Sequence, residues 1–328
     1  MQPDLNEPVA LGFDIGGSTT RVGLISQSGR ILAVEKFPTD VESSGLDNFL
    51  AEFLEMLRDM LRRASQPVVG IGGTFLGWID EARSGPYLCI NAPTLHGLNL
   101  RKILDEQFEL PVRLIDDSNA HALAEYHFGV GQGCRRFMNL AMGTGLSAAV
   151  ILYGEPLQFT CGCVGDTGHL ILRPGGPSCS AGCKGCAEAF IGVAGIERLA
   201  LEKYGFSVTA RQVIEHACAG DDHIAAAVIT EVGGYVGELL ASLSHIFLPE
   251  RISLSGGTSN AGQILLDAVR KRFEYLVGDY HRLYASRASG YYDGVEIVLG
   301  KLKEETGLIG ATIGLFRDPL ILSKDNGH

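Results

Sequence analysis

The stretch LGFDIGGSTTRVGLIS, residues 11–26, decides the fold. An apolar run rich in β-branched residues ends at Gly16 and Gly17, and a second such run follows, which predicts a strand, a tight turn and another strand. Residues 138–154 repeat this order around the turn 143–145, about 127 residues further along the chain. Because the same glycine-turn meander occurs twice, we expect two related domains that face one cleft.

The rest of the chain alternates between strand-like and helix-like segments, which is typical of an α/β protein. Apolar spacing predicts an amphipathic helix over 46–61 and further helices over 119–129, 221–247, 261–276 and 306–316. Strands are expected at 31–37, 67–73, 111–117, 250–257 and 294–300. We expect an N-terminal domain at 1–120, rejoined by a C-terminal helix within 306–328, and a larger domain with a cysteine cluster at 121–305.

Composition excludes several classes of protein. The chain has 328 residues with 46% hydrophobic residues, enough for about two domains with sizeable cores. It carries 27 Lys and Arg against 38 Asp and Glu, and an acidic chain without a basic run is poorly suited to bind nucleic acid. We find neither a secretory signal nor a run of the ~18 to 20 apolar residues that a membrane span needs. We therefore expect a soluble cytoplasmic protein with reduced cysteines.

Two glycine turns are candidate phosphate sites. Glycines let backbone N–H groups approach a phosphate closely, hydroxyls add donors, and a nearby acidic residue can hold Mg²⁺, usually through water. The first turn offers Asp14, Gly16, Gly17, Ser18 and Thr19, and the second offers Gly143, Thr144 and Gly145. An ordinary hairpin turn is the alternative for the first, and the repeat weakens that alternative.

Other nucleotide motifs fit less well. Residues 143–148 match the loose dinucleotide pattern G-x-G-x-x-A, but a strand-like run follows where that fold needs a helix. No G-x-x-x-x-G-K-[ST] motif occurs, which excludes a P-loop enzyme. Gly256 and Gly257, between an expected strand and helix, could seat a purine or phosphate by close backbone approach, or form a plain strand-to-helix turn.

Asp116 and Asp117 end an expected strand and precede an expected helix. A carboxylate at that place can accept a hydroxyl proton during phosphoryl transfer. The alternative is that Asp117 or Ser118 only caps the helix.

Cysteines cluster within residues 161–186, after the second glycine turn. Cys179, Cys183 and Cys186 follow His169, and three thiolates with one imidazole can form a closed tetrahedral Zn²⁺ site. Buried or free thiols are the alternative, and Cys161 and Cys163 would exceed four ligands, so we expect those two to be core thiols. The remaining histidines show no ligand spacing and fit ordinary surface or helix positions: His96, His121, His127, His216, His223, His245, His281 and His328.

Taken in order, these segments resemble the ROK family of sugar kinases and repressors, within the hexokinase and actin-like ATPase superfamily. The resemblance runs from Gly12 to about Phe316. The matching segments are 14–19, 70–80, 91–93, 116–120, 143–145, 166–169, 185–188 and 255–257. The resemblance implies two actin-like ATPase (ribonuclease H-like) domains, each a mixed sheet flanked by helices, around a central cleft that closes on the sugar.

The resemblance also implies roles for individual residues. Asp117 would be the general base for a hexose hydroxyl, and the glycine turns together with Gly256 and Gly257 would bind ATP with Mg²⁺. The sugar would be held by Asn91, Asp116, Asp166, His169 and Glu188. A structural Zn²⁺ and a homodimer or homotetramer belong to the same implied description, with glucose to glucose 6-phosphate as the first candidate reaction.

Three positions depart from the family pattern. Asp116 stands where the family usually has Asn, Asp166 stands where it usually has Glu, and the zinc run has Ala181 in its middle position with a shifted Cys183. The first two changes affect groups that would contact sugar hydroxyls, because an ionised Asp can only accept hydrogen bonds.

Other functions remain open at this level. The acceptor could be allose, fructose or N-acetylmannosamine, since epimers differ by single hydrogen bonds, and polyphosphate could replace ATP. A non-catalytic sugar sensor is the alternative from another class. Repressors of this family normally carry an N-terminal helix-turn-helix, and only about ten residues precede the first expected strand here.

Overall fold

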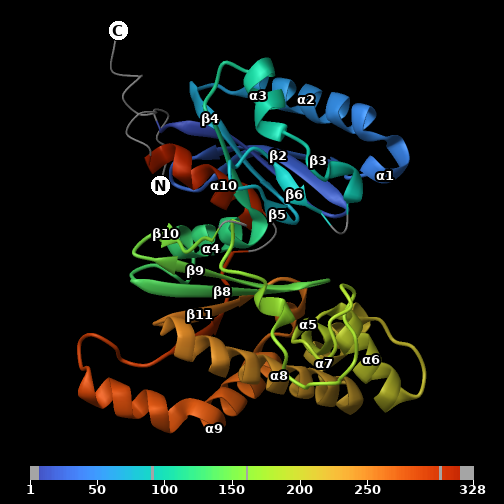
Figure 1. Cartoon of the computed structure of the whole chain (residues 1–328), viewed down its shortest axis with the longest axis vertical. Coiled ribbons are helices and arrows are strands. Elements are labelled where there is room, and N and C mark those ends of the chain that lie inside the picture. The colour runs from blue at the N-terminus through green and yellow to red at the C-terminus, as the bar shows by residue number, and fades with distance from the viewer. Residues whose placement is uncertain (1–6, 90–91, 160–161, 303–304, 318–328) are drawn as a thin grey trace. The chain divides into compact units, whose positions relative to one another are not determined.

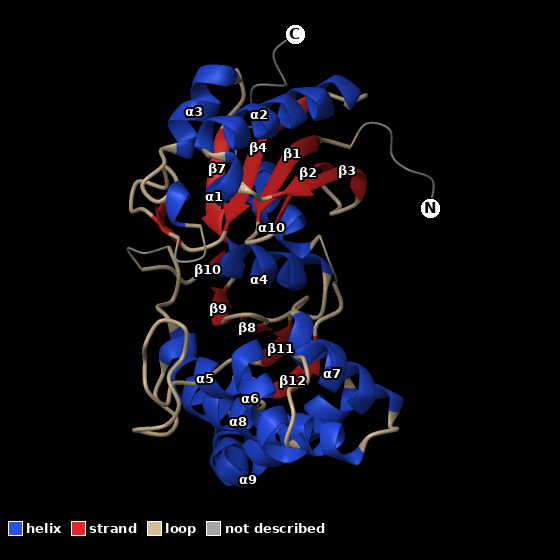
Figure 2. Cartoon of the chain, turned by 90° about the vertical axis from the view of Figure 1, so that its right-hand side faces the viewer, coloured by secondary structure: helices blue, strands red, loops and turns tan. Residues whose placement is uncertain are grey.

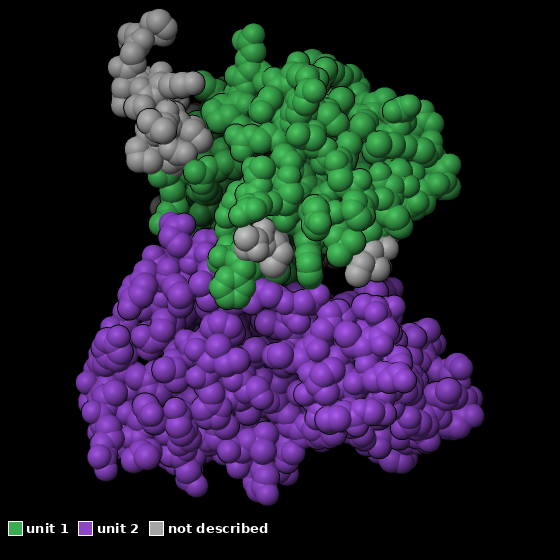
Figure 3. Space-filling model, viewed as in Figure 1, with its two compact units in different colours: residues 1–129, 158–163, 302–328 green, residues 130–157, 164–301 purple. Residues whose placement is uncertain are grey.

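The computed structural model describes residues 7–89, 92–159, 162–302 and 305–317. The chain divides into two compact units, coloured separately in Figure 3. Unit 1 comprises residues 1–129, 158–163 and 302–328, and unit 2 comprises residues 130–157 and 164–301. The break expected near residue 120 falls within helix α4 (Asp117–Phe128), which belongs to unit 1 as a whole.

Unit 1 is built around a five-stranded mixed sheet (Figure 1). The strand order is β3-β2-β1-β4-β7, in which β2 is antiparallel to β1 and β3, while β1, β4 and β7 are parallel. These strands are β1 (Val9–Ile15), β2 (Thr19–Ser26), β3 (Ile31–Pro38), β4 (Val68–Phe75) and β7 (Val112–Asp116). A small hairpin joins β5 (Trp78–Ile79) to β6 (Pro86–Leu88).

Helices cover both faces of this sheet (Figure 2). They are α1 (Val41–Ser44), α2 (Leu46–Arg63), α3 (Leu100–Gln107), α4 and α10 (Thr306–Arg317), with a 3-10 turn η1 (Pro93–Leu95). Because successive strand residues point to opposite faces, Phe13 packs edge-on against Phe53 of α2, while Gly12 lies against Leu308 of α10. The helix predicted over 46–61 is confirmed and runs two residues further, and the helix predicted over 306–316 matches α10.

Unit 2 repeats the sheet topology with the order β10-β9-β8-β11-β12. Strand β9 is antiparallel to β8 and β10, and β8, β11 and β12 are parallel. The strands are β8 (Arg136–Met142), β9 (Leu146–Leu152), β10 (Glu155–Pro156), β11 (Arg251–Ser255) and β12 (Glu296–Leu299). The duplicated meander predicted from the glycine turns is therefore confirmed in both sheets.

The helices of unit 2 were only partly anticipated. Helices α8 (His223–Phe247) and α9 (Gln263–Arg287) match expected segments, and α9 continues eleven residues beyond the predicted end at 276. The elements that the apolar pattern of the sequence does not predict are η2 (Thr167–His169), α5 (Glu188–Ile191), α6 (Val193–Tyr204), α7 (Ala210–Ala219) and η3 (Gly257–Ala261).

Helix α8 is long and apolar. By length and composition alone it could cross a membrane, with a mean hydropathy of 1.5 over its most apolar window, which corrects the expectation that the chain holds no such run. In the structure it is a core helix. Val228, Val232 and Val236 are fully buried, and Gly233 and Gly237 allow close approach to α9.

Candidate active site

The parallel strands of unit 1 end at one edge of the sheet, and this edge collects the predicted catalytic residues. Strand β1 leads into Asp14 and the turn 16–19, and β7 ends in Asp116 directly before Asp117. In open α/β sheets the carboxyl ends of parallel strands are the usual place for ligands. The local sequence thus places two carboxylates and a glycine turn on one edge.

The first glycine turn is tight and open to solvent. The N–H of Gly16 donates to the carbonyl oxygen of Thr19 over 3.1 Å, and a Cβ on Gly17 would meet no atom within 4 Å. Asp14 is 8% exposed, and its Oδ2 lies 3.7 Å from Arg21 Nη1. Burial raises the pKa of Asp14, while the charges of His121 and Arg21 lower it. A buried acid beside an exposed glycine turn suits a phosphate with its metal ion.

Asp116 caps helix α4. Its Oδ1 accepts from the Asn119 N–H over 3.0 Å and its Oδ2 accepts from Asn119 Nδ2 over 2.5 Å. The same Nδ2 donates to the carbonyl oxygen of Gly162 over 2.7 Å, so Asn119 ties the helix start to this residue. Asn119 Oδ1 is buried without a hydrogen-bond partner among the described residues. The capping alternative weighed for Asp117 therefore applies to its neighbour, Asp116.

Asp117 is the first residue of α4 and is partly buried. The Ser118 hydroxyl donates to its Oδ1 over 3.2 Å. Burial raises the pKa of Asp117, and the charge of His121 and the bonds from Ser118 act in the opposite direction. Because Asp116 performs the capping, the carboxylate of Asp117 is not needed for it and can serve as a proton acceptor.

The buried carboxyl of Asp116 makes stability depend on pH. Burial, followed by the charge of Asp117, raises the pKa of Asp116 from 3.8 to about 7. Between these values the folded chain keeps a proton that the unfolded chain releases, so this group's contribution to stability is present at low pH and is lost as the pH rises through about 7.

Asp116→Asn should remove that contribution. The free energy of unfolding of the variant relative to the wild type should rise with pH, by up to about 1.4 kcal/mol per unit, between pH 4 and the Asp116 pKa. Urea unfolding at several pH values measures it. A difference that stays constant over this range would contradict the buried, protonated Asp116.

Unit 2 places its predicted residues around the second glycine turn. The Gly143 N–H donates to the Gly145 carbonyl oxygen over 2.9 Å. Glu188 supports the turn, because its Oε2 accepts from the Leu146 N–H over 3.3 Å and would lie 3.2 Å from a Cβ on Gly145. Thr144 packs through its carbonyl oxygen against Gly192, where α6 begins.

The third glycine turn lies beside the second. Strands β8 and β11 are parallel neighbours, with Ala141 opposite Ser255, so the turns that follow them share the carboxyl edge of this sheet. Gly256 has φ +83°, and a Cβ there would lie 2.4 Å from the Met142 carbonyl oxygen, so only glycine fits. A Cβ on Gly257 would meet nothing within 4 Å, and the buried Thr258 hydroxyl has no partner among the described residues.

The 166–169 segment packs against the start of β9, directly after the second glycine turn. The Thr167 hydroxyl accepts from the Ala148 N–H over 2.8 Å, and a Cβ on Gly168 would lie 2.0 Å from the Leu146 carbonyl oxygen. His169 Nε2 lies 3.7 Å from Asp166 Oδ2. Thr167 and Gly168 thus hold the candidate sugar ligands Asp166 and His169 beside the second glycine turn.

The other side of His169 faces the cysteine cluster. Its Nδ1 lies 3.6 Å from Cys179 Sγ, and ligand atoms of His169, Cys179 and Cys183 all lie within 4.8 Å of one another. Cys186 is buried beside them: burial, with smaller contributions from Cys179 and Cys183 and against the lowering effect of the Ala189 backbone, raises the pKa of its thiol to about 11. Gly182, with φ +91°, closes the turn by donating to the Cys179 carbonyl oxygen.

Several residues lie outside these groupings. Asn91 and Cys161 lie outside the described residues. Cys163 is partly exposed, which corrects the expectation of a core thiol, because it lies in a bend outside the strands and helices of the core. Asn119 and His121 were given no role by the sequence reading, although their spacing from Asp116 and Asp117 places them on the first turns of one helix.

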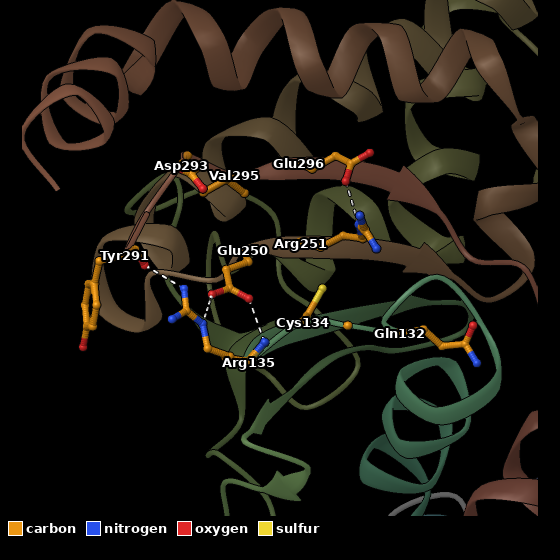
Figure 4. Close-up of a pocket in the computed structure, with 11 residues that line it drawn as sticks. Gln132, Cys134, Arg135, Glu250, Arg251, Tyr291, Asp293, Val295 and Glu296 are labelled. Carbon is orange, nitrogen blue, oxygen red and sulfur yellow. Dashed lines mark hydrogen bonds and ion pairs between the residues drawn. The ribbon is translucent and has the colours of Figure 1, made fainter. Parts of the chain in front are cut away.

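A separate pocket of about 600 Å³ opens at the opposite edge of the unit 2 sheet (Figure 4). It lies where β8, β11 and β12 begin, away from the glycine turns at the strands' other ends. Two ion pairs line it: Arg135 Nε lies 2.9 Å from Glu250 Oε1, and Arg251 Nε lies 2.6 Å from Glu296 Oε2. This pocket does not contain any of the predicted site residues.

Two duplicated sheets with glycine turns and carboxylates at their carboxyl edges define a protein of the actin-like ATPase fold. The chain belongs to the ROK family, whose family model matches residues 10–317. It is 30% identical over 323 residues to a glucokinase of Thermotoga maritima, covering 92% of this chain and 95% of that protein.

A solved ROK hexokinase of Thermus thermophilus superimposes with a TM-score of 0.78 at 30% identity, covering 97% of this chain and 100% of that one. A DNA-binding transcriptional dual regulator of Escherichia coli, NagC, is 27% identical over 270 residues, covering 79% of this chain and 66% of the regulator.

Proposed function

We propose that this chain is a sugar kinase that transfers the γ-phosphoryl group of ATP to a hexose, with glucose as the first candidate and glucose 6-phosphate as its product. The observation that carries the proposal is the carboxyl edge of unit 1. There Asp117 is the first residue of α4, and its neighbour Asp116 caps the helix. Asp14 lies beside an exposed glycine turn. The similarity to a glucokinase and to a ROK hexokinase supports the same reaction.

In the proposed reaction Asp117 is the general base. Its carboxylate accepts the proton of the sugar hydroxyl while the hydroxyl oxygen forms a bond to the γ-phosphorus. The bond between that phosphorus and the oxygen bridging to the β-phosphate breaks, and its electron pair leaves with ADP. The Asp116–Asn119–Gly162 contacts keep the first turn of α4, and with it Asp117, in place.

ATP enters as its magnesium complex, and the metal neutralises charge on the phosphates during transfer. On the protein side, we assign phosphate binding to Asp14, Gly16, Gly17, Ser18 and Thr19 and to Gly143, Thr144 and Gly145. Gly256 and Gly257 would accept the adenosine side, where the absence of a Cβ at Gly257 leaves room. Backbone N–H groups in such turns favour anions.

The sugar ligands proposed are Asn91, Asp116, Asp166, His169 and Glu188. Both oxygens of Asp116 already accept from Asn119, so it would contact a sugar through its remaining lone pairs while it caps α4. Asp166 and Glu188 are acceptors for sugar hydroxyls, and His169 Nε2 faces Asp166.

We also infer a structural Zn²⁺ held by His169, Cys179, Cys183 and Cys186. With bonds of about 2.0 to 2.3 Å, tetrahedral ligands lie somewhat under 4 Å apart, and the 3.6 Å between His169 Nδ1 and Cys179 Sγ fits this geometry. The set of three thiols and one imidazole is a typical closed zinc site. The ion would fix the cysteine loop between η2 and α5, which carries Glu188 at its end.

The zinc proposal predicts about one zinc per chain in purified protein. Cys183→Ser should lower the bound zinc at least about tenfold under a competing chelator, because a hydroxyl is a far weaker ligand than a thiolate. Cys218→Ser, which changes an exposed cysteine outside the cluster, is the control. Elemental analysis measures both variants, and equal zinc content in them would contradict the assignment of Cys183.

A sugar sensor without turnover is the second candidate, and the similarity to NagC favours it. Other hexoses, N-acetylhexosamines and polyphosphate stay as alternative substrates within the kinase proposal. We further propose a cytoplasmic homodimer or homotetramer that binds no nucleic acid or membrane. An ADP-release assay with MgATP and a panel of hexoses tests the kinase, and sugar binding without ADP release would favour the sensor.

A further inference from the structure

His121 is a titratable group that the proposed reaction leaves unused. It lies in the second turn of α4, four residues after Asp117, and residues at this spacing share one face of a helix. Its side chain is partly buried. The helix that presents the general base therefore also presents an imidazole on the same side.

Asp14 and His121 both lie beside Gly307 of helix α10. A Cβ on Gly307, in the first turn of α10, would lie 2.9 Å from Asp14 Oδ2 and 3.4 Å from His121 Nε2. Because residue 307 is glycine, no side chain from this position separates the carboxylate of Asp14 from the edge of the imidazole. Three elements, β1, α4 and α10, thus bring these groups together.

The electrostatics of this cluster tie the imidazole to both acids. The charge of His121 lowers the pKa of Asp117 and the pKa of Asp14, each of which burial raises. The charge of Asp117 raises the pKa of Asp14, so the two carboxylates repel each other. A cation that acts on both relieves this repulsion.

Among the described residues, the other charged or titratable groups at the cluster are Arg21, Cys89 and Asp116. Arg21, from β2, pairs with Asp14. Cys89, which follows β6, has a thiol whose pKa is raised to about 11 by burial and by the charge of Asp117. Asp116, next to Asp117, accepts a hydrogen bond from the Asn119 side chain.

We propose that His121 is a positioning residue of the kinase reaction, an imidazole shared by Asp14 and Asp117 that keeps the Asp117 carboxylate directed at the sugar hydroxyl. The proposal rests on the proposed function, and it adds a residue that the spacing of the motifs does not identify.

Three variants separate charge from shape. His121→Phe keeps a ring without charge, His121→Gln keeps a donor without charge, and His121→Lys keeps the positive charge. We expect kcat to fall at least about tenfold in the Phe and Gln variants, with KM for sugar and for ATP within about twofold of the wild type. His121→Lys should return kcat to within about threefold of the wild type. His127→Phe, the same change further along α4, is the control and should leave kcat unchanged.

A measurement without substrate separates this inference from the proposed function. Carboxyl-carbon NMR of the wild type and Asp117→Asn identifies the Asp117 resonance, which should titrate at higher pH in His121→Phe. If the Asp117 resonance titrates at the same pH in His121→Phe as in the wild type, the role of His121 is overturned. A His121→Phe kcat within twofold of the wild type would overturn it as well. Equal losses in the Phe, Gln and Lys variants would also overturn it. If the wild type turns over no hexose, the kinase proposal fails, and the resonance alone decides whether His121 is the partner of Asp117.

Discussion

Asp117→Asn is expected to lower kcat for phosphoryl transfer about 10³-fold, within the usual range of 10² to 10⁴ for loss of a general base. The amide has the size of the carboxylate but cannot take the proton of the sugar hydroxyl. The Asp116–Asn119 bonds that hold the start of α4 do not involve the Asp117 side chain, so the helix should keep its place.

Sugar affinity separates this loss from misfolding. Calorimetry should give a sugar Kd for Asp117→Asn within about threefold of the wild type, because the change preserves the shape of the site. Ser118→Ala is a neighbouring control: it removes the hydroxyl that donates to Asp117 Oδ1 and should reduce kcat far less. An Asp117→Asn enzyme with near wild-type kcat would contradict the assignment of the base.

Gly310→Ala is expected to destabilise unit 1 by about 3 kcal/mol, at the upper end of the usual cost of overpacking. A Cβ at this position would lie 1.7 Å from the carbonyl oxygen of Ala120, which belongs to the backbone of α4 and cannot rotate away. Helix α10 would have to withdraw from α4, and it also lies against Gly72 of β4. The contact that keeps Gly307 beside Asp14 would be disturbed as well.

The matched control is Gly234→Ala in α8, where an added Cβ would meet nothing within 4 Å. There the better helix propensity of alanine should stabilise the chain by up to about 1 kcal/mol. The melting temperatures of the two variants should therefore shift in opposite directions from that of the wild type. A Gly310→Ala protein as stable as the wild type would show that α10 does not pack on α4 in this way.

The sheets could be predicted from the sequence because their signal is local. Apolar runs that end at Gly16 and at Gly143 identify each hairpin, and the repetition of the pattern identifies the duplicated topology. The helices between 188 and 219 were not specified. They are short, and the faces that they bury are small and partly made of alanine, such as Ala210, Val213 and Ala217 of α7, so their apolar spacing gives a weak signal.

The part of the site that depends on distant contacts could not be predicted. Asp116 and Asp117 are adjacent and look equivalent in the sequence, and only the bonds to Asn119 show which of them caps α4. His121 looks like an ordinary helix residue until α10 brings Gly307 against both it and Asp14. The roles of Asp166, Glu188 and the shifted Cys183 stay predictions, although the structure groups them around the second glycine turn and the cysteine loop.

The most direct test of the central claim is ADP release by the wild-type chain with MgATP against a panel of hexoses and N-acetylhexosamines, with Asp117→Asn in parallel. Phosphorus NMR of the product identifies the hydroxyl that is phosphorylated. The account predicts turnover with at least one hexose, glucose first, formation of a sugar phosphate, and loss of both signals in the variant. Silence across the panel while calorimetry shows that the chain binds a sugar would contradict the kinase and support the sensor.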